Sequence, residues 1–222
     1  MGIHDGHRQR VYDRFRKEGL DSFSPHNVLE MLLFYSIPRA DTNEIAHRLI
    51  ERFGSLAAVF DAPESELVKV TGVGERSAVL IKMIPQLSRY YMTDKTADVI
   101  INSSRQAGEY LLPRYVGRTV ETVMVVCLDN KGKVINTTIV HEGNINVSEV
   151  SVQAVASVAL QSKASAIIIA HNHPDGVALP SGDDISTTKL ICRTLAALNV
   201  KVVDHIIIGD NDFVSVFDSG KL

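Results

Sequence analysis

The sequence predicts an α+β protein in which an all-helical N-terminal domain precedes a domain with a mixed sheet flanked by helices. Apolar residues recur at helical spacing, between helix-capping residues, across positions 24–91. From residue 120 onward, β-rich segments alternate with helical ones, an order that favours a mixed sheet covered by helices. The polar segment 92–98 has no apolar periodicity and separates the two regions. We therefore expect domains at residues 1–95 and 100–222.

Capping residues mark the helices of the N-terminal region. Ser24, which is followed by proline, starts one helix, and Asp41 caps a second helix that ends before Gly54. A short third helix is expected at 63–70. A tight turn rich in glycine then leads into a fourth helix at 75–90, so this region contains helices alone.

The C-terminal region begins with a predicted hairpin. Two β-rich segments, 120–128 and 133–140, flank an Asp-Asn-Lys-Gly turn. The elements expected after it are a helix at 147–161, a strand at 166–170, a helix at 181–198 and strands at 201–208 and 213–217. A mixed sheet between helices is the most economical packing for this order.

Composition and charge exclude several classes of protein. With 45% hydrophobic and 22% charged residues, the 222-residue chain can fold around a core. A net charge of −3 leaves no overall positive field for nucleic acid, which only a local patch could then contact. No stretch reaches the ~18 apolar residues of a membrane span. The N-terminus also lacks the apolar core of a leader peptide, so we expect a cytoplasmic protein with no membrane partner.

The chain has two cysteines, Cys127 and Cys192, and no C-x-x-C pair for zinc or redox chemistry. Both lie in apolar or amphipathic runs, where a small core residue is the expected role. This usage suits a reducing compartment.

The segment HNHPDGVALPSGDD, residues 171–184, suggests a metal site. His171 and His173, at the end of an apolar strand, project from one face and can aim two imidazoles at one point. A loop stiffened by two prolines then returns the chain, so that Asp184, one turn into a helix, can add a carboxylate oxygen. Two nitrogens and one oxygen suit zinc, and three protein ligands leave a fourth position to water.

Two simpler interpretations apply to the same residues. A pair of histidines in a loop can be solvated, and Ser181 with Asp184 fits the S-x-x-D capping box of an ordinary helix start. The conjunction of a strand-end H-x-H, seven intervening residues and S-x-x-D favours the metal site.

This H-x-H…S-x-x-D pattern resembles the JAMM motif of the JAB/MPN metalloprotease superfamily. The longer string HNHPDG…PS…D, with Asp204-His205 downstream, resembles the RadC family of bacterial proteins over essentially the whole chain. The resemblance implies a zinc-binding MPN (JAB-like) domain over residues 100–222. It also implies hydrolase chemistry of the metallopeptidase or isopeptidase type, on a peptide or protein substrate that the sequence does not identify.

The resemblance further implies roles for individual residues. His171, His173 and Asp184 are the expected zinc ligands, and Ser181 is expected to hydrogen-bond the reacting centre and help hold the oxyanion. Members of the superfamily use a glutamate on the first strand as general base, and Glu121 stands at that place in this sequence.

Two other glutamates are candidates for the general base, and two other histidines are considered as ligands. Glu142 and Glu149, which follow the second predicted strand, are rival candidates for the general base. His205 has apolar neighbours and is expected to be a satisfied core histidine, or one that supports a ligand, and not a ligand itself. His141 carries no signal beyond its nearness in sequence.

The segment VTGVGERS, residues 70–77, suggests the turn of a helix-hairpin-helix unit. Gly72 and Gly74 would let backbone amides at the start of the next helix face a phosphate without reading base sequence. The segment resembles DNA-binding hairpins of repair proteins, although a plain helical corner has the same pattern. Residues 1–99 carry 13 basic and 14 acidic side chains, so any DNA contact would be confined to this hairpin and to the arginine-rich N-terminal arm.

Two hypotheses follow from these motifs. The first is a zinc-dependent hydrolase, and the second is a non-catalytic, DNA-associated accessory protein whose MPN domain is a binding scaffold. A nucleobase deaminase is disfavoured, because the H-x-E and P-C-x-x-C strings of such enzymes are absent.

Overall fold

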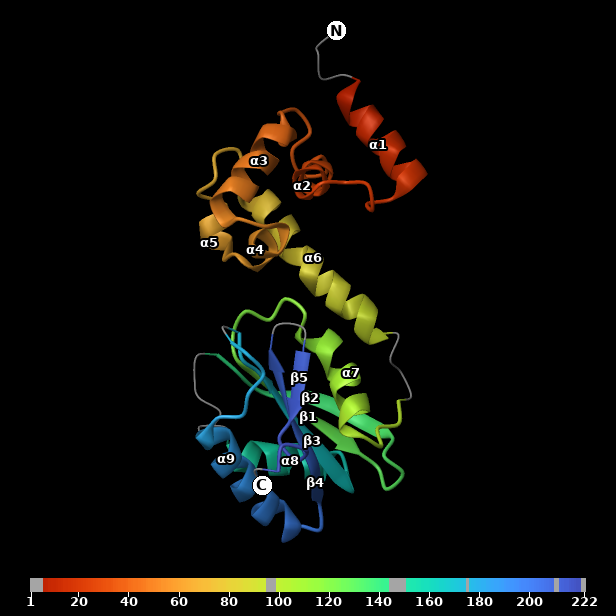
Figure 1. Cartoon of the computed structure of the whole chain (residues 1–222), viewed down its shortest axis with the longest axis vertical. Helices are drawn as coiled ribbons and strands as arrows, with labels where there is room; N and C mark the ends of the chain where they lie inside the picture. Colours follow the sequence, from red (N-terminus) through yellow and green to blue (C-terminus); the bar gives the residue numbers. More distant parts are fainter. Residues whose placement is uncertain (1–5, 95–98, 144–150, 175, 210–211, 221–222) are drawn as a thin grey trace. The chain divides into compact units, whose positions relative to one another are not determined.

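Figure 1 shows the computed structural model of the chain, which describes residues 6–94, 99–143, 151–174, 176–209 and 212–220. The chain divides into two compact units, residues 1–87 and 88–222. Each unit has an apolar core of its own.

Helices make up the first unit. They are α1 (His7–Glu18), α2 (Pro25–Leu33), α3 (Thr42–Phe53), α4 (Leu56–Asp61), α5 (Glu64–Leu67) and the first part of α6 (Glu75–Asp94). The apolar faces of α2 to α6 meet in one cluster, in which Leu29, Leu49 and Ile81 are fully buried, and α1 packs on α2 in a smaller cluster through Val11. The turn before α6 needs glycine at position 72, where φ is +95° and a Cβ would lie 2.7 Å from Ile45 Cδ1.

The predicted capping residues of α3 act as caps, whereas Ser24 lies at the N-cap of α2 without a side-chain hydrogen bond to the helix. The Asp41 carboxylate accepts a hydrogen bond from the Asn43 amide, and Gly54 ends α3 with a φ of +88°. Helix α4 was not predicted, because its six residues are too few for helical periodicity to be evident. The sequence signal for it is Ser55, whose hydroxyl accepts a hydrogen bond from the Ala58 amide.

Two boundaries differ from the prediction. Helix α5 ends at Leu67, before the expected end near Val70. Helix α6 continues past Tyr90 to Asp94 and so includes the start of the polar segment that was expected to be a linker. The rest of that segment, residues 95–98, lies outside the described residues.

The second unit contains a mixed sheet between two helical layers, as predicted. Its elements are α7 (Ser104–Tyr115), β1 (Thr122–Leu128), β2 (Val134–Glu142), α8 (Val152–Gln161), β3 (Ala166–Asn172), α9 (Gly182–Ala196), β4 (Lys201–Gly209) and β5 (Asp212–Ser215). The strand order is β2-β1-β3-β4-β5, in which β3 and β4 pair in parallel and the other neighbours pair antiparallel. Helices α8 and α9 pack on one face of the sheet and α7 packs on the other (Figure 1).

Helix α7 was not predicted, because Gly108 and Pro113 lie within it and both are poor helix formers. Its sequence signal is Ser103, whose hydroxyl accepts from the Gln106 amide at the helix start. Gly108 is needed where it stands, since a Cβ there would lie 2.2 Å from the ring of Phe213 on β5. Close packing of α7 on the sheet therefore outweighs local helix propensity.

Cys127 is buried and Cys192 is half-buried, and both are free thiols. Across the described parts of the chain, no helix is both long enough and apolar enough to cross a membrane.

Candidate metal centre

The end of β3 and the start of α9 bring His171, His173 and Asp184 together. His171 lies in the strand, and the backbone amide of His173 donates to the carbonyl of Ile208, 2.8 Å away, which keeps the chain beside β4. One ligand atom from each of the three residues can be chosen so that all lie within 4.8 Å of one another. The structure thus gathers the predicted ligand set at one point.

The distances between these groups suit a shared cation. His171 Nε2 lies 2.9 Å from His173 Nε2 and 3.2 Å from Asp184 Oδ1, and His173 Nε2 lies 3.8 Å from Asp184 Oδ2. The unprotonated nitrogen of an imidazole and the oxygens of a carboxylate are all acceptors, so they cannot satisfy one another without a proton or a metal ion between them. Nitrogen and oxygen ligands of this kind can hold zinc and related metals.

The capping box and the metal site use different oxygens of Asp184. Oδ2 accepts hydrogen bonds from the Ser181 amide at 2.7 Å and the Ser181 hydroxyl at 2.6 Å, while the Asp184 amide donates back to Ser181 Oγ. Oδ1 is the atom near His171. The two interpretations of S-x-x-D are therefore compatible, because the cap orients the carboxylate and leaves one oxygen for a metal.

A buried chain of hydrogen bonds determines which nitrogen of His171 faces the site. The Thr188 hydroxyl donates to the Asp184 carbonyl at 2.5 Å, so its oxygen accepts from His205 Nδ1 at 2.6 Å. His205 Nε2 is then bare and accepts from His171 Nδ1 at 2.8 Å. A neutral His171 consequently presents an unprotonated Nε2 to the site.

Burial lowers the pKa of His205 well below its usual value, and the neighbouring His171 acts in the same direction. A neutral His205 is what the hydrogen-bond chain requires. The prediction that His205 supports a ligand agrees with this contact to His171.

A bulge in β4 determines which face of the sheet His205 and its neighbour Asp204 each take. Ile167 pairs with Val202, but Ile168 pairs with Asp204, so Val203 is an extra residue in β4. His205 therefore lies on the face that carries His171, and Asp204 lies on the α7 face.

The site is open on one side. The side chains of His171 and Asp184 are 0% and 3% exposed, whereas that of His173 is 27% exposed. His173 Nδ1 donates to the Val177 carbonyl at 3.4 Å, which leaves Nε2 free to bind a metal. Water or a substrate can thus approach beside His173.

Asp184 is ionised within the site. Burial by itself would raise the pKa of this carboxyl group, but the neighbouring His171 and the hydrogen bonds from Ser181 hold it well below its usual range. Asp184 is therefore a charged ligand at all pH values where the histidines can bind a metal.

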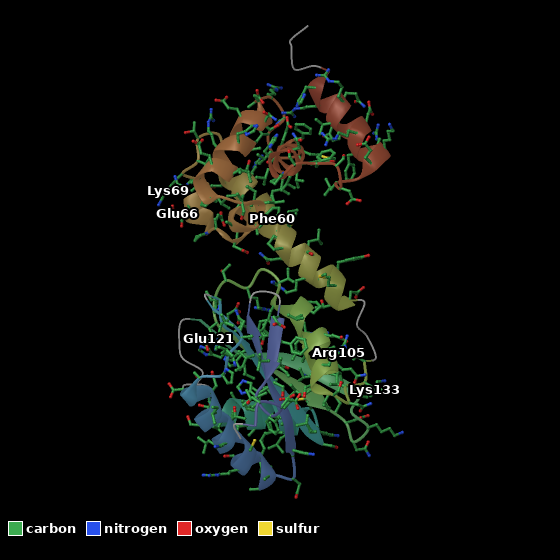
Figure 2. All side chains as sticks on the ribbon, viewed as in Figure 1. Phe60, Glu66, Lys69, Arg105, Glu121 and Lys133 are labelled. Atoms are coloured by element: carbon green, nitrogen blue, oxygen red, sulfur yellow. The ribbon has the colours of Figure 1, made fainter. Side chains whose placement is uncertain are left out.

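The register of the sheet places Glu121 on the same face as the candidate ligands. Val123 of β1 pairs with His171 of β3, and Glu121 stands two residues before Val123, where an extended chain repeats its facing. The carbonyl of Glu121 accepts from the Gly143 amide at 3.0 Å, which continues the pairing with the chain after β2. Figure 2 shows Glu121 at the edge of the second unit where β1 begins.

Asn172, which sequence reasoning did not single out, holds the segment around Glu121. Its buried side chain accepts from the Thr122 amide at 2.8 Å and donates to the Val120 carbonyl at 3.1 Å. These two groups flank Glu121 in the chain. The sequence shows Asn172 as a polar residue between two histidines at a strand end. Its role could not be predicted from that position, because its hydrogen-bond partners are 50 and 52 positions away in the chain.

The rivals of Glu121 have different surroundings. Glu142 pairs with Thr122, which faces away from His171, and it forms a 3.0 Å ion pair with Arg118. Glu149 lies outside the described residues. His141 lies in register with Val123 on the His171 face, and its buried Nε2 has no hydrogen-bond partner among the described residues.

Fold and site together define a class of protein: a domain with a mixed sheet and flanking helices in which two histidines and an aspartate could hold one metal ion. Residues 101–221 match the family model described as RadC-like JAB domain. The chain therefore belongs to the RadC family of the JAB/MPN superfamily, which confirms the resemblance found in the sequence.

Proposed function

We propose that the protein is a zinc-dependent hydrolase that cleaves amide or isopeptide bonds in a peptide or protein substrate. The observation that carries this proposal is the cluster of His171, His173 and Asp184, in which three acceptors converge and one side is open. When bound there, zinc lowers the pKa of a coordinated water to near neutrality and polarises the substrate carbonyl.

The chain supplies the remaining chemistry. Glu121 accepts a proton from the attacking water on its carboxylate and delivers it to the leaving amine nitrogen. The Ser181 hydroxyl donates to Asp184 Oδ2 in this structure and would have to rotate away from that oxygen to donate to the developing oxyanion when substrate binds. The hydrogen bonds from Asn172 to the backbone around Glu121 keep the base in place.

Metal content tests the ligand set. The purified protein is stripped with a strong chelator, reloaded with zinc and analysed by mass spectrometry for bound metal. We expect one zinc per chain in the wild type and none in Asp184→Asn, whereas Asp183→Asn, at the exposed neighbouring position, retains it. Zinc retained by Asp184→Asn and His171→Ala would refute these ligands.

Cleavage of a peptide library tests the catalytic role of Glu121. We expect Glu121→Gln to keep its zinc and to lose at least about 100-fold in rate, the usual contribution of a general base. Glu142→Gln is the matched control and should keep the rate. The opposite pattern would transfer the role of base to Glu142.

We further propose, as a second candidate function, that the first unit binds DNA through the hairpin at residues 70–77. In its favour, Thr71, Gly72 and the segment 74–76 are exposed, whereas Val70, Val73 and Ser77 are buried. Arg48 Nη1 donates to the Thr71 carbonyl at 3.0 Å. Two nearby cations are already engaged, because Lys69 pairs with Glu66 and Lys82 Nζ bonds the Phe60 carbonyl at 2.7 Å (Figure 2 labels Phe60, Glu66 and Lys69).

Gly74→Ala tests this second function without disturbing the fold, because the Cβ would meet no atom within 4 Å. The added methyl group should hinder a phosphate at the amides of the turn, so we expect weaker, salt-sensitive binding of duplex DNA. Unchanged affinity in Gly74→Ala would exclude the hairpin as the contact.

A further inference from the structure

Helix α6 carries a row of large apolar side chains on an exposed face. We call this row the α6 stripe, and it consists of Val79, Met83, Leu87 and Tyr90, which are 53%, 47%, 56% and 71% exposed. Because three or four positions separate each residue from the next, all of them lie along one side of the helix. Figure 1 shows α6 as one continuous helix, so the geometry of the stripe depends on α6 alone.

The core of the first unit does not account for the α6 stripe. Helix α6 joins that core through Ala78 and Ile81, which are fully buried. The helical repeat places these two residues on the side of α6 opposite to the stripe. Large apolar side chains gathered on a protein surface mark an interaction site. The stripe is therefore a surface for another molecule, and its composition indicates which one.

The apolar residues of the α6 stripe are arranged almost symmetrically about position 85 of the chain. When two copies of α6 lie antiparallel across a two-fold axis at this position, Val79 of one copy meets Tyr90 of the other. Met83 meets Leu87 in the same way, and each of these pairs occurs twice. The apolar part of the stripe is thus complementary to itself.

Two residues of opposite charge extend the α6 stripe at its ends. Arg76 lies one turn before the stripe and Asp94 lies one turn after it, on the same side of the helix. Both are exposed, and neither forms an ion pair with a described residue. In the antiparallel pair, Arg76 of each copy meets Asp94 of the other. A parallel pair would place like charges together, so charge complementarity selects the antiparallel arrangement.

We propose that the α6 stripe is a dimer interface, and that its occupant is the α6 stripe of a second copy of this chain in antiparallel orientation. Four apolar side chains and two charges from each copy make a small interface, so the dimer is weak and its population depends on protein concentration. The proposal is independent of any catalytic activity.

Sedimentation equilibrium of the full chain tests the dimer. We expect the average mass of the wild type to rise from monomer toward dimer between about 1 and 300 μM. Met83→Asp, which places two charges at the centre of the interface, should remain monomeric over this range. Leu160→Asp on α8 is the matched control, because Leu160 is 52% exposed and lies off the stripe, and it should dimerise as the wild type does.

Two outcomes of that experiment would overturn the proposal. A wild-type chain that is monomeric at every concentration would show that no second copy occupies the stripe. Equal dimerisation of Met83→Asp and Leu160→Asp would place the interface elsewhere. Because both substituted side chains are exposed, both variants are expected to fold, and thermal unfolding followed by circular dichroism checks this.

Charge reversal tests the antiparallel orientation. Arg76→Glu and Asp94→Arg each place like charges at both ends of the interface, so each should weaken the dimer about two- to tenfold. The double variant restores two pairs of opposite charge and should recover the affinity of the wild type. Single variants that dimerise like the wild type, or a double variant that recovers nothing, would overturn the antiparallel arrangement.

Discussion

Asp184 and Asp204 are two buried carboxylates of the same unit, and their surroundings differ. Asp184 is 2% exposed and Asp204 is 4% exposed, so burial does not distinguish them. Both oxygens of Asp184 have polar neighbours, namely the Ser181 cap and the His171 imidazole, and its pKa is well below the usual range. Only one oxygen of Asp204 is hydrogen-bonded, and burial raises its pKa.

This difference teaches that the partners of a buried carboxylate, more than its depth, determine its chemistry. On the α9 face, hydrogen bonds hold Asp184 as an anion ready for a cation. On the α7 face, burial favours the neutral form of Asp204, and its Oδ2 has no hydrogen-bond partner among the described residues. Variants on either face test this difference between the two carboxylates.

The largest effect is expected for zinc affinity when the Thr188 hydroxyl is removed. Thr188→Val removes the acceptor of His205 Nδ1 and with it the constraint that leaves His171 Nε2 bare. We expect zinc affinity, measured by competition with a chromogenic chelator, to fall about 10–100-fold, as for other groups that orient metal ligands. Thr194→Val, at a half-buried position of the same helix where the hydroxyl bonds only the Leu190 carbonyl, is the control. If both variants bind zinc equally well, the hydrogen-bond chain does not orient His171.

The α7 face should be sensitive to packing. Gly108→Ala would bring a methyl group 2.2 Å from the Phe213 ring, so we expect the free energy of unfolding to fall by about 1–3 kcal/mol. Gly182→Ala, at the first position of α9, would meet no atom within 4 Å and should leave stability unchanged or raise it by up to about 1 kcal/mol. Urea unfolding measures both, and equal stabilities would contradict the close fit of α7 on the sheet.

The smallest effect is a difference in the pH dependence of stability in metal-free protein. The pKa of Asp184 is lowered by folding, so its stabilisation is present above its unfolded pKa of about 4 and is lost as the pH falls. The pKa of Asp204 is raised by folding, so its stabilisation is present below about pH 4 and is lost as the pH rises through the folded value.

Unfolding curves recorded from acid to neutral pH separate the two contributions. As the pH rises from acid to neutral, the free energy of unfolding of Asp184→Asn should fall relative to that of the wild type. The free energy of unfolding of Asp204→Asn should rise relative to that of the wild type over the same range. Parallel curves for both variants would show that the two carboxylates are equivalent.

Local patterns account for the parts of the fold and site that were predicted correctly. His171 and His173 are two residues apart at a strand end, and Ser181 and Asp184 are three apart at a helix start, so strand and helix geometry places each pair on one side of its element. The positions of the strands along the chain were predicted from β-rich segments that lie between turn residues. Helices α4 and α7 were not predicted. Helix α4 is short, and α7 contains Gly108 and Pro113, whose low helix propensity is outweighed by tertiary packing.

The sequence by itself determined the alternation of elements, the candidate ligand set and the family of the protein, because each depends on residues close together in the chain. Only the tertiary structure decided that Thr188 and His205 orient His171, that Asn172 holds the segment around Glu121, and that Asp204 lies on the α7 face. These contacts join residues 17 to 52 positions apart and depend on strand register and on one bulge in β4. A one-residue change of register reverses the facing of a side chain, and no local pattern specifies where a bulge falls.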